Sequence, residues 1–428
     1  MTRRAISFVL VLLALPVSTK ALDGDVTIYG TVSPFFDNLR ASGATKPGLS
    51  PASGGATQVA ADAYTGLDTP ARFRLTSGTS NLGFKGGLDL LGEDLQVFFQ
   101  VESAVSLDGE APSSWNGRNT GAGLKGKFGR VLFGIWDTPY KYATPFMGAI
   151  RSLNPYDNGL VGYPGFGVPA TTTQTGRTGK AADASFSRRQ GNSLQYWSPE
   201  VMGFSARLAY SANEGKTSET KTARSISPAV YSGLLSYVKG PVTVRYGYER
   251  HEDYFGLTQL GGSAAATATN DGSTDEGHEL VAHLSLPTGT RISGIVERLT
   301  FKNQEAEAGK VSRYTRDAYF ALVQQRFAEH QLWGSFGQAL PGECAVVDGS
   351  CRTGGLGATQ YALGYSYALG KSAEVYAAFY RLVNARSASY AVVSSPAVPP
   401  GSDTTGVGLG ILYTFQATAT VGSPKGTP

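Results

Sequence analysis

Short and long connections alternate along this chain between residues 26 and 415, and this alternation limits the possible folds more than any other feature. About sixteen segments in which apolar and polar residues alternate can be traced along the chain. Seven minimal turns join them in pairs, at residues 91–94, 126–129, 198–203, 239–241, 287–289, 328–329 and 370–372. Longer polar connections lie between these turns, at residues 37–69, 105–117, 137–188, 212–227, 252–275, 303–311, 340–357 and 384–402.

An even number of strands, with short turns at one end and long loops at the other, is typical of bacterial outer-membrane barrels. The sequence therefore predicts an all-β fold, a sixteen-stranded antiparallel transmembrane β-barrel over residues 22–415. Both termini would lie at the short-turn end, which is the periplasmic end of such a barrel.

The composition agrees with a barrel wall rather than with a helical membrane protein. Charged residues make up 16% of the chain and aromatic residues 11%, and the mean hydropathy is −0.14. In a barrel every second residue faces lipid and its neighbours face water, so the mean is unremarkable. After the N-terminal segment no run of 18 apolar residues occurs, so no transmembrane helix is predicted.

The N-terminal segment has the pattern of an export signal. Arg3 and Arg4 precede an apolar core at residues 5–17, and Thr19-Lys20-Ala21 offers a cleavage site with small residues. An uncleaved anchor is the alternative, but the apolar core is too short to span a bilayer. We therefore expect a signal peptide at residues 1–21. Without it, basic and acidic residues nearly balance, which argues against a nucleic-acid partner.

Cys344 and Cys351 are the only cysteines, and six residues separate them in one predicted loop. In an exported protein such a pair favours a local disulfide, with two free thiols as the alternative. Two cysteines do not complete a tetrahedral zinc shell. No metal site and no cofactor are predicted.

Period-2 patterns assign a face to each residue of the predicted strands. In the last strand, Val407, Leu409, Ile411 and Tyr413 form an apolar face, with glycines between them. This strand must pair with the first, at residues 26–36, because an open edge in hydrocarbon leaves backbone groups unsatisfied. Four tyrosines near strand ends are expected in the aromatic girdles at the lipid interfaces: Tyr29, Tyr196, Tyr376 and Tyr413.

Motifs spread over nearly the whole remaining chain carry a family resemblance. They are Val26-Thr27-Ile28-Tyr29-Gly30, Ser80 through Gly86, Leu95 through Ser103, Arg118 through Leu124, Arg189 with Asn192-Ser193-Leu194, and Thr359 through Leu369. Each motif is loose alone, but their order and spacing together are specific. On these residues the chain resembles the general-diffusion porins of Gram-negative bacteria, especially the sixteen-stranded trimeric porins typical of beta-proteobacteria and Neisseria.

The resemblance implies a passive channel for small hydrophilic solutes and ions across the outer membrane, assembled as a homotrimer and surrounded by lipid and lipopolysaccharide. It also implies that the third long loop, residues 137–188, folds inward and narrows the lumen. A connection of about fifty residues is unusually long, which itself argues for a role.

Charges at the narrowing would set the ion selectivity. By the resemblance, Arg118 and Arg189 occupy cationic wall positions and Glu102 matches a wall carboxylate. The period-2 pattern independently places Glu102 on the polar face. The remaining candidates belong to the second strand and to the loop: Arg74, Lys85, Asp157 and Asp183. For each charge, the alternative is a solvated loop or rim residue.

The chain departs from the family pattern at three places. Asn81 and Ile135 stand where arginines are usual, and residues 416–428 continue beyond Phe415, where family members normally end. We expect residues 416–428 to be a disordered tail, because they are small and polar. With Asn81 in place of a cation, we expect a weaker preference for anions than in strongly basic members.

Three other functions are considered. A substrate-specific channel for sugars or anions is the nearest, and loop aromatics could form a sugar slide: Phe146, Tyr156, Tyr163 and Phe166. An enzyme is not expected, because none of the four histidines lies in a recognisable nucleophile motif. A structural or adhesion barrel would pass little current.

Overall fold

A computed structural model of the chain describes residues 24–45, 68–90, 95–109, 117–144, 158–165, 184–212, 216, 218–220, 225–254, 256–259, 272–304, 311–349, 351–391 and 398–421. The predicted signal peptide lies outside the described residues.

Nineteen β-strands and two short helices make up the described structure. The first strands are β1 (Gly24–Val32), β2 (Phe35–Ser42), β3 (Thr69–Thr76), β4 (Asn81–Asp89), β5 (Leu95–Ala104), β6 (Thr120–Gly126) and β7 (Gly129–Asp137). Next come α1 (Pro139–Ala143), β8 (Arg189–Trp197), β9 (Phe204–Ala212), β10 (Ala229–Lys239), β11 (Val242–Glu252) and the 3₁₀-helix η4 (Gly256–Gln259). The last strands are β12 (Ser273–Ser285), β13 (Thr290–Asn303), β14 (Val311–Phe327), β15 (His330–Ala339), β16 (Glu343–Val346), β17 (Ala358–Ala368), β18 (Ala373–Asn384) and β19 (Asp403–Val421).

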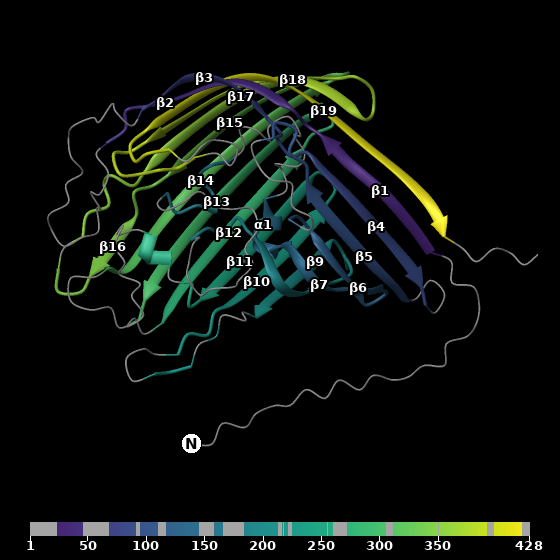
Figure 1. Cartoon of the computed structure of the whole chain (residues 1–428), viewed down its shortest axis with the longest axis horizontal. Coiled ribbons are helices and arrows are strands. Elements are labelled where there is room, and N and C mark those ends of the chain that lie inside the picture. Colours follow the sequence, from purple (N-terminus) through teal and green to yellow (C-terminus); the bar gives the residue numbers. More distant parts are fainter. Residues whose placement is uncertain are drawn as a thin grey trace, which may run out of the picture.

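The strands form one antiparallel sheet that closes on itself. β19 pairs with β18 on one side and with β1 and β2 on the other. Three wall strands are interrupted, because β1 continues as β2, β3 as β4, and β15 as β16 along β14. Sixteen strands therefore circle the barrel, which confirms the predicted number (Figure 1).

The first two interruptions lie side by side and have a local cause. Pro34, between β1 and β2, has no N–H to donate to a ladder. Gly78, between β3 and β4, has φ +54°, and a Cβ there would lie 2.3 Å from the Ser33 carbonyl oxygen. The Ser33 amide donates to Ser80 Oγ instead of to a neighbouring strand (2.9 Å).

Six of the seven predicted turns coincide with gaps between paired strands, and the seventh, residues 91–94, lies outside the described residues.

Two long connections are shorter than predicted. β2 runs on to Ser42, since Asp37, Leu39 and Ala41 continue its alternate burial. The connection predicted at residues 340–357 contains β16.

The predicted end of the barrel at residue 415 is wrong. β19 continues to Val421, and residues 416–421 pair with β1 from Tyr29 back to Gly24. Composition suggested disorder, but threonine alternates through this segment and favours extended backbone. The free edge of β1 supplies the hydrogen-bonding partners. Residues 422–428 lie outside the described residues.

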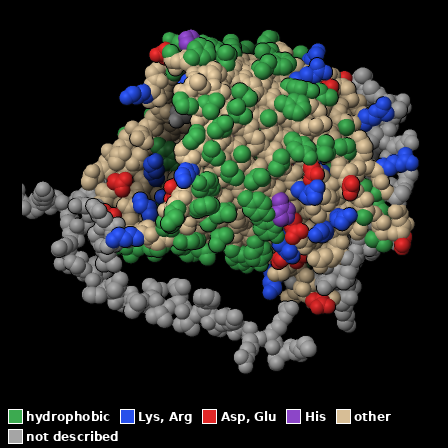
Figure 2. All heavy atoms as spheres, turned by 180° about the vertical axis from the view of Figure 1, so that it is seen from behind, with side chains coloured by type: hydrophobic (Ala, Val, Ile, Leu, Met, Phe, Trp, Pro, Cys, Tyr) green, Lys and Arg blue, Asp and Glu red, His purple; other side chains and the backbone are tan. Residues whose placement is uncertain are grey.

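The outer face of the wall is apolar and the inner face is mixed. Along β13, Ile292 and Val296 are exposed, while Ser293, Ile295 and Glu297 at the alternate positions are buried. Apolar side chains cover much of the outer surface seen from behind (Figure 2). The period-2 assignment is confirmed for the last strand, whose four predicted outward residues are all exposed.

Two of the four predicted girdle tyrosines face the wrong way. Tyr196 and Tyr413 are exposed on the outside, but Tyr376 is buried and stacks on Phe35. Tyr29 also points inward, since its hydroxyl donates to Glu102. In each strand, alternation decides the direction of the side chain, and nearness to a strand end does not.

Wall height differs around the barrel. β6 has 7 residues and β7 has 9, whereas β13 has 14 and β14 has 17. The tall strands also form part of the main internal cluster, in which Leu160 and Val161 of the third loop pack with inward-facing residues such as Ile295 and Phe320. Among the described residues, no helix combines the length and the apolarity needed to cross a bilayer.

Candidate pore-lining site

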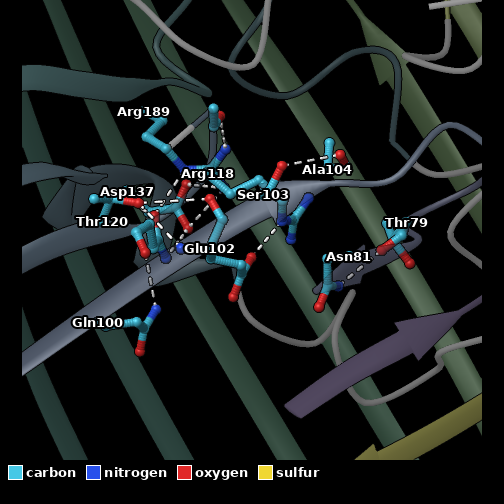
Figure 3. A network of polar contacts seen from close by, with 12 residues as sticks. Thr79, Asn81, Gln100, Glu102, Ser103, Ala104, Arg118, Thr120, Asp137 and Arg189 are labelled. Atoms are coloured by element: carbon cyan, nitrogen blue, oxygen red, sulfur yellow. Dashed lines mark hydrogen bonds and ion pairs between the residues drawn. The ribbon is translucent and has the colours of Figure 1, made fainter. Parts of the chain in front are cut away.

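Glu102 and Arg118, two of the predicted wall charges, form an ion pair on the inner wall (Figure 3). Arg118 Nε donates to Glu102 Oε1, and the Tyr29 hydroxyl donates to Oε2 of the same carboxylate (2.9 Å). The backbone fixes the pair as well, because the Arg118 amide donates to the Glu102 carbonyl oxygen (3.2 Å). Charge-assisted contacts on both carboxylate oxygens hold Glu102 in one position.

Arg189 belongs to a second cluster, centred on Asp137 at the end of β7. Its Nη2 lies 3.3 Å from Asp137 Oδ1, and its Nε donates to Asn119 Oδ1 (2.7 Å). The Asn119 amide group donates to Asp137 Oδ2 (2.9 Å), and Lys141 Nζ lies 2.9 Å from Oδ1. Asp137 and Arg189 are the residues that begin and end the third loop, so this cluster closes the loop at its base.

The two arginines differ in their access to the lumen. Arg189 exposes 4% of its side chain, whereas Arg118 exposes 26%. Arg118 is therefore the more accessible of the two from the lumen, and Arg189 mainly holds the loop ends together.

The other wall candidates lie on the first strands. Arg74 forms a two-point ion pair with Asp37 across the β2–β3 pairing, at 3.0 and 2.6 Å. Lys85 lies over the Tyr29 ring, 5.0 Å from its centroid. Asn81 donates its amide to the Thr79 carbonyl oxygen (2.9 Å). Of these three side chains, only that of Lys85 is an exposed cation.

Three described parts of the third loop contact the inner face of the opposite wall. The Tyr140 amide in α1 donates to Ser232 Oγ on β10 (3.0 Å). Gly159 donates to Gln360 on β17 (2.9 Å), and Gly162 donates to Glu297 on β13 (2.6 Å). Phe186, shortly before β8, stacks on the His251 ring of β11 at a centroid distance of 4.4 Å.

A buried ion pair lies under this loop. Arg316 Nη1 is 2.9 Å from Glu297 Oε2, and neither side chain is exposed. Arg316 Nη2 also donates to the carbonyl oxygens of Leu160 (2.9 Å) and Tyr163. The Tyr140 hydroxyl donates to Glu297 Oε1 (2.7 Å). Burial, reinforced by Glu297 and Glu279, raises the pKa of Tyr140 well above its usual value, so this hydroxyl stays a donor.

Asp157 and Asp183, the predicted acidic loop residues, lie outside the described residues. Of the four loop aromatics proposed as a sugar slide, only Tyr163 is described, and it is packed against the internal cluster. Cys344 and Cys351 form a disulfide in the connection that contains β16. The described residues hold no group of three metal-binding side chains.

Sequence reasoning missed Asn119, Asp137 and Lys141. The sequence does carry a signal for Asp137 and Lys141. Thr138 followed by Pro139 is typical of a helix start, and Asp137 lies four residues before Lys141. In the structure, Thr138 Oγ1 caps α1 by accepting from the Lys141 amide (3.3 Å). Four further inward arginines, Arg130, Arg207, Arg245 and Arg291, were not singled out as pore residues either.

Comparisons with known proteins agree with this architecture. A family model described as Gram-negative porin matches residues 7–387. Major outer membrane protein P.IA of Neisseria meningitidis serogroup A is 27% identical over 298 residues, which cover 63% of this chain and 69% of that protein. Protein P.IB of the same organism is 29% identical over 246 residues, covering 57% of this chain and 59% of P.IB, less than two thirds of its length.

Two solved structures share the fold. The anion-selective porin from Comamonas acidovorans matches with a TM-score of 0.64 and 20% identity, covering 92% of this chain and 100% of that one. OmpF of Salmonella typhi, solved with daunomycin, matches with a TM-score of 0.53 and 16% identity, covering 92% of this chain and 97% of that one.

Proposed function

Because this chain belongs to the Gram-negative porin family, we propose that it is a passive channel through which small hydrophilic solutes and ions cross the outer membrane. One observation carries the proposal. The barrel is closed, its outer face is apolar, and its inner face carries the fixed charges Glu102, Arg118 and Lys85. A barrel of sixteen strands is wide enough for an aqueous channel.

We place the solute path along the arc of β1 to β6. Of the strands that the described parts of the third loop contact, β10, β11 and β13 lie across the barrel from that arc, and β17 lies three strands from β1. A loop seated on one side of the lumen leaves its opening beside the opposite wall. On this proposal, Lys85, Glu102 and Arg118 lie next to the passing solute, and Asp157 and Asp183 are the acids of the loop.

Ion selectivity at this level should be modest. Arg74 is paired with Asp37, Arg118 with Glu102 and Arg189 with Asp137, so each of these three arginines lies beside a carboxylate. Asn81 adds no charge. Paired charges orient water and dipolar solutes but only weakly sort ions by sign. We therefore expect a slight preference for anions, which fades as salt screens the charges.

We also propose that the channel is a homotrimer in which lipid and lipopolysaccharide surround the outward faces. The family is typically trimeric. Arg250 and Lys302 lie on the outer face near the long-loop ends of β11 and β13, where lipopolysaccharide phosphates would be found. Cross-linking in mild detergent tests the trimer, and a ladder that ends at one copy would contradict it.

Planar-bilayer recording of the refolded chain without residues 1–21 tests the channel directly. Stepwise conductance increases of uniform size are expected, together with swelling of liposomes in small sugars. A correctly folded barrel, recognised by its heat-dependent gel migration, that inserts without passing current would instead indicate a structural barrel.

A further inference from the structure

Arginine and aromatic side chains alternate in a stack on the inner wall near the short-turn end of the barrel. Its members come from five strands and from α1 of the third loop, in the order Phe98, Arg130, Trp197, Arg207, Tyr142 and Arg245. Trp197 is shared by Arg130 and Arg207, whose guanidinium carbons lie 5.0 and 4.0 Å from its ring centroid. Tyr142 is shared by Arg207 and Arg245, at 3.4 and 5.8 Å.

The guanidinium carbon of Arg130, the first arginine of the stack, lies 4.8 Å from the centroid of the Phe98 ring. Arg291 continues the row of cations on β13. All four arginines point inward, because their alternate neighbours on each strand, such as Phe133, Leu208 and Tyr246, are exposed on the outer face. Each arginine also lies within four residues of the start of its strand, directly after a short turn.

These cations differ from those of the Glu102 site in having no acidic partner. Among the described residues, none of the four arginines forms an ion pair with a carboxylate, whereas Arg74, Arg118 and Arg189 each do. Arg245 Nη1 and Arg291 Nε are buried and have no hydrogen-bond partner in the part of the chain that the structure describes. Arg207 also makes a hydrogen bond with Tyr142, and Arg245 Nε donates to Ser236 Oγ (3.3 Å). Because a guanidinium group has five N–H donors, each arginine keeps donors for a ligand carboxylate.

We propose that this arginine–aromatic stack is a binding track for small organic dicarboxylates that cross the channel. A single aromatic ring separates successive guanidinium groups, so the two ends of one short dicarboxylate can meet two arginines. A monocarboxylate can occupy only one of them, and a single phosphate is too compact to reach both. The inference rests on the proposed channel function and names the solute class that this channel favours.

The test is inhibition of chloride current by succinate in planar bilayers at about 0.1 M salt, where screening still permits charge contacts. Acetate and inorganic phosphate are compared at equal ionic strength. Succinate should halve the current at a concentration about three- to tenfold below that of acetate, because it makes one additional charge-assisted contact. Phosphate should resemble acetate.

Arg207→Gln, at the centre of the stack, should remove this difference between succinate and acetate. Arg207→Lys keeps the charge but loses the planar fork and should retain only part of the difference. Arg298→Gln is the matched control, because Arg298 is 63% exposed on the outer wall and pairs there with Asp317. It should leave the inhibition unchanged.

The results separate the two proposals. A wild-type barrel that conducts, but that succinate and acetate inhibit equally, overturns the track and leaves the channel intact. Equal inhibition of the Arg207→Gln and Arg298→Gln variants by succinate also overturns it, and would indicate that the stack only positions α1. A wild-type barrel that does not conduct overturns the channel itself. If Arg207→Gln does not fold, Arg130→Gln and Arg291→Gln give the same comparison.

Discussion

Arg316 and Glu297 form an ion pair that is completely buried between the barrel wall and the third loop, with 2.9 Å between Nη1 and Oε2. The two residues lie on the neighbouring strands β14 and β13. Glu297 Oε1 accepts from the Tyr140 hydroxyl and the Gly162 amide, and Arg316 Nη2 donates to the Leu160 carbonyl oxygen, so a charge pair within the wall fixes the position of a distant segment.

Removing one partner of this pair should release the loop. Arg316→Met leaves the Glu297 carboxylate buried without its cation, which costs about 3–5 kcal/mol in comparable cases. We expect larger and noisier single-channel conductance, together with a lower midpoint of thermal unfolding. Arg298→Gln is the matched control on the same two strands, since its exposed pair with Asp317 contributes about 1 kcal/mol or less. Equal behaviour of the two variants would contradict the anchoring role.

The Tyr140 hydroxyl should remain protonated in alkaline solution. Its pKa is raised by burial, and so the hydrogen bond to Glu297 persists above pH 10 and is lost only as the pH rises through the elevated value. Difference absorbance titration of the wild type against Tyr140→Phe checks this, because the missing tyrosine should contribute no signal near pH 10. A phenolate signal at ordinary pKa would show that the hydroxyl is solvated.

Opposite substitutions in the Glu102–Arg118 pair should shift ion selectivity in opposite directions. Glu102→Gln leaves Arg118 as the free charge and should raise the anion preference, whereas Arg118→Gln should lower it. Asn81→Arg should also raise the anion preference. Reversal potentials under a salt gradient measure each effect, and we expect about twofold changes in the permeability ratio that shrink at high ionic strength. If both substitutions shifted the permeability ratio in the same direction, Glu102 and Arg118 would not lie beside the solute path.

Loss of the disulfide should affect stability and leave conduction unchanged. Cys344 and Cys351 close a short segment that begins within β16, away from the Glu102 site. Replacement of both cysteines by serine should lower the free energy of unfolding by about 2–3 kcal/mol, as for other small loops. Conductance equal to that of the wild type, with faster protease cleavage near residue 350, is the expected result. A changed conductance would place this loop at the pore mouth.

Truncation after Phe415 should yield a barrel that still closes. Gly24 through Tyr29 lose their partners on β19 but keep those on β4, and β18 pairs with β19 only as far as Tyr413. We expect normal conductance and a lower temperature of heat-induced gel migration. A truncated chain that fails to fold would make residues 416–421 necessary for closure.

The sequence predicted the barrel well because alternation is a local property. Each strand shows its two faces by itself, and a short turn fixes the register of the strands that it joins. The pore pairs were harder to predict. Glu102 and Arg118 were named as separate wall charges from the family resemblance, and their pairing was not predicted. Asp37–Arg74 and Glu297–Arg316 also depend on which strands become neighbours. The stack at Trp197 was missed because its rings and cations come from five strands and one loop, and no spacing within a single segment reveals them.

The unequal wall heights have a consequence for how the barrel sits in a bilayer. A strand needs about 9–11 tilted residues to cross the hydrocarbon, and β6 with 7 falls short while β14 with 17 extends far beyond it. A lone barrel would have to thin the membrane along its low arc, at a cost that grows with each ångström of mismatch. Contact between the low arcs of neighbouring copies would remove that lipid boundary, so the height of the wall predicts which side of the barrel turns away from the membrane.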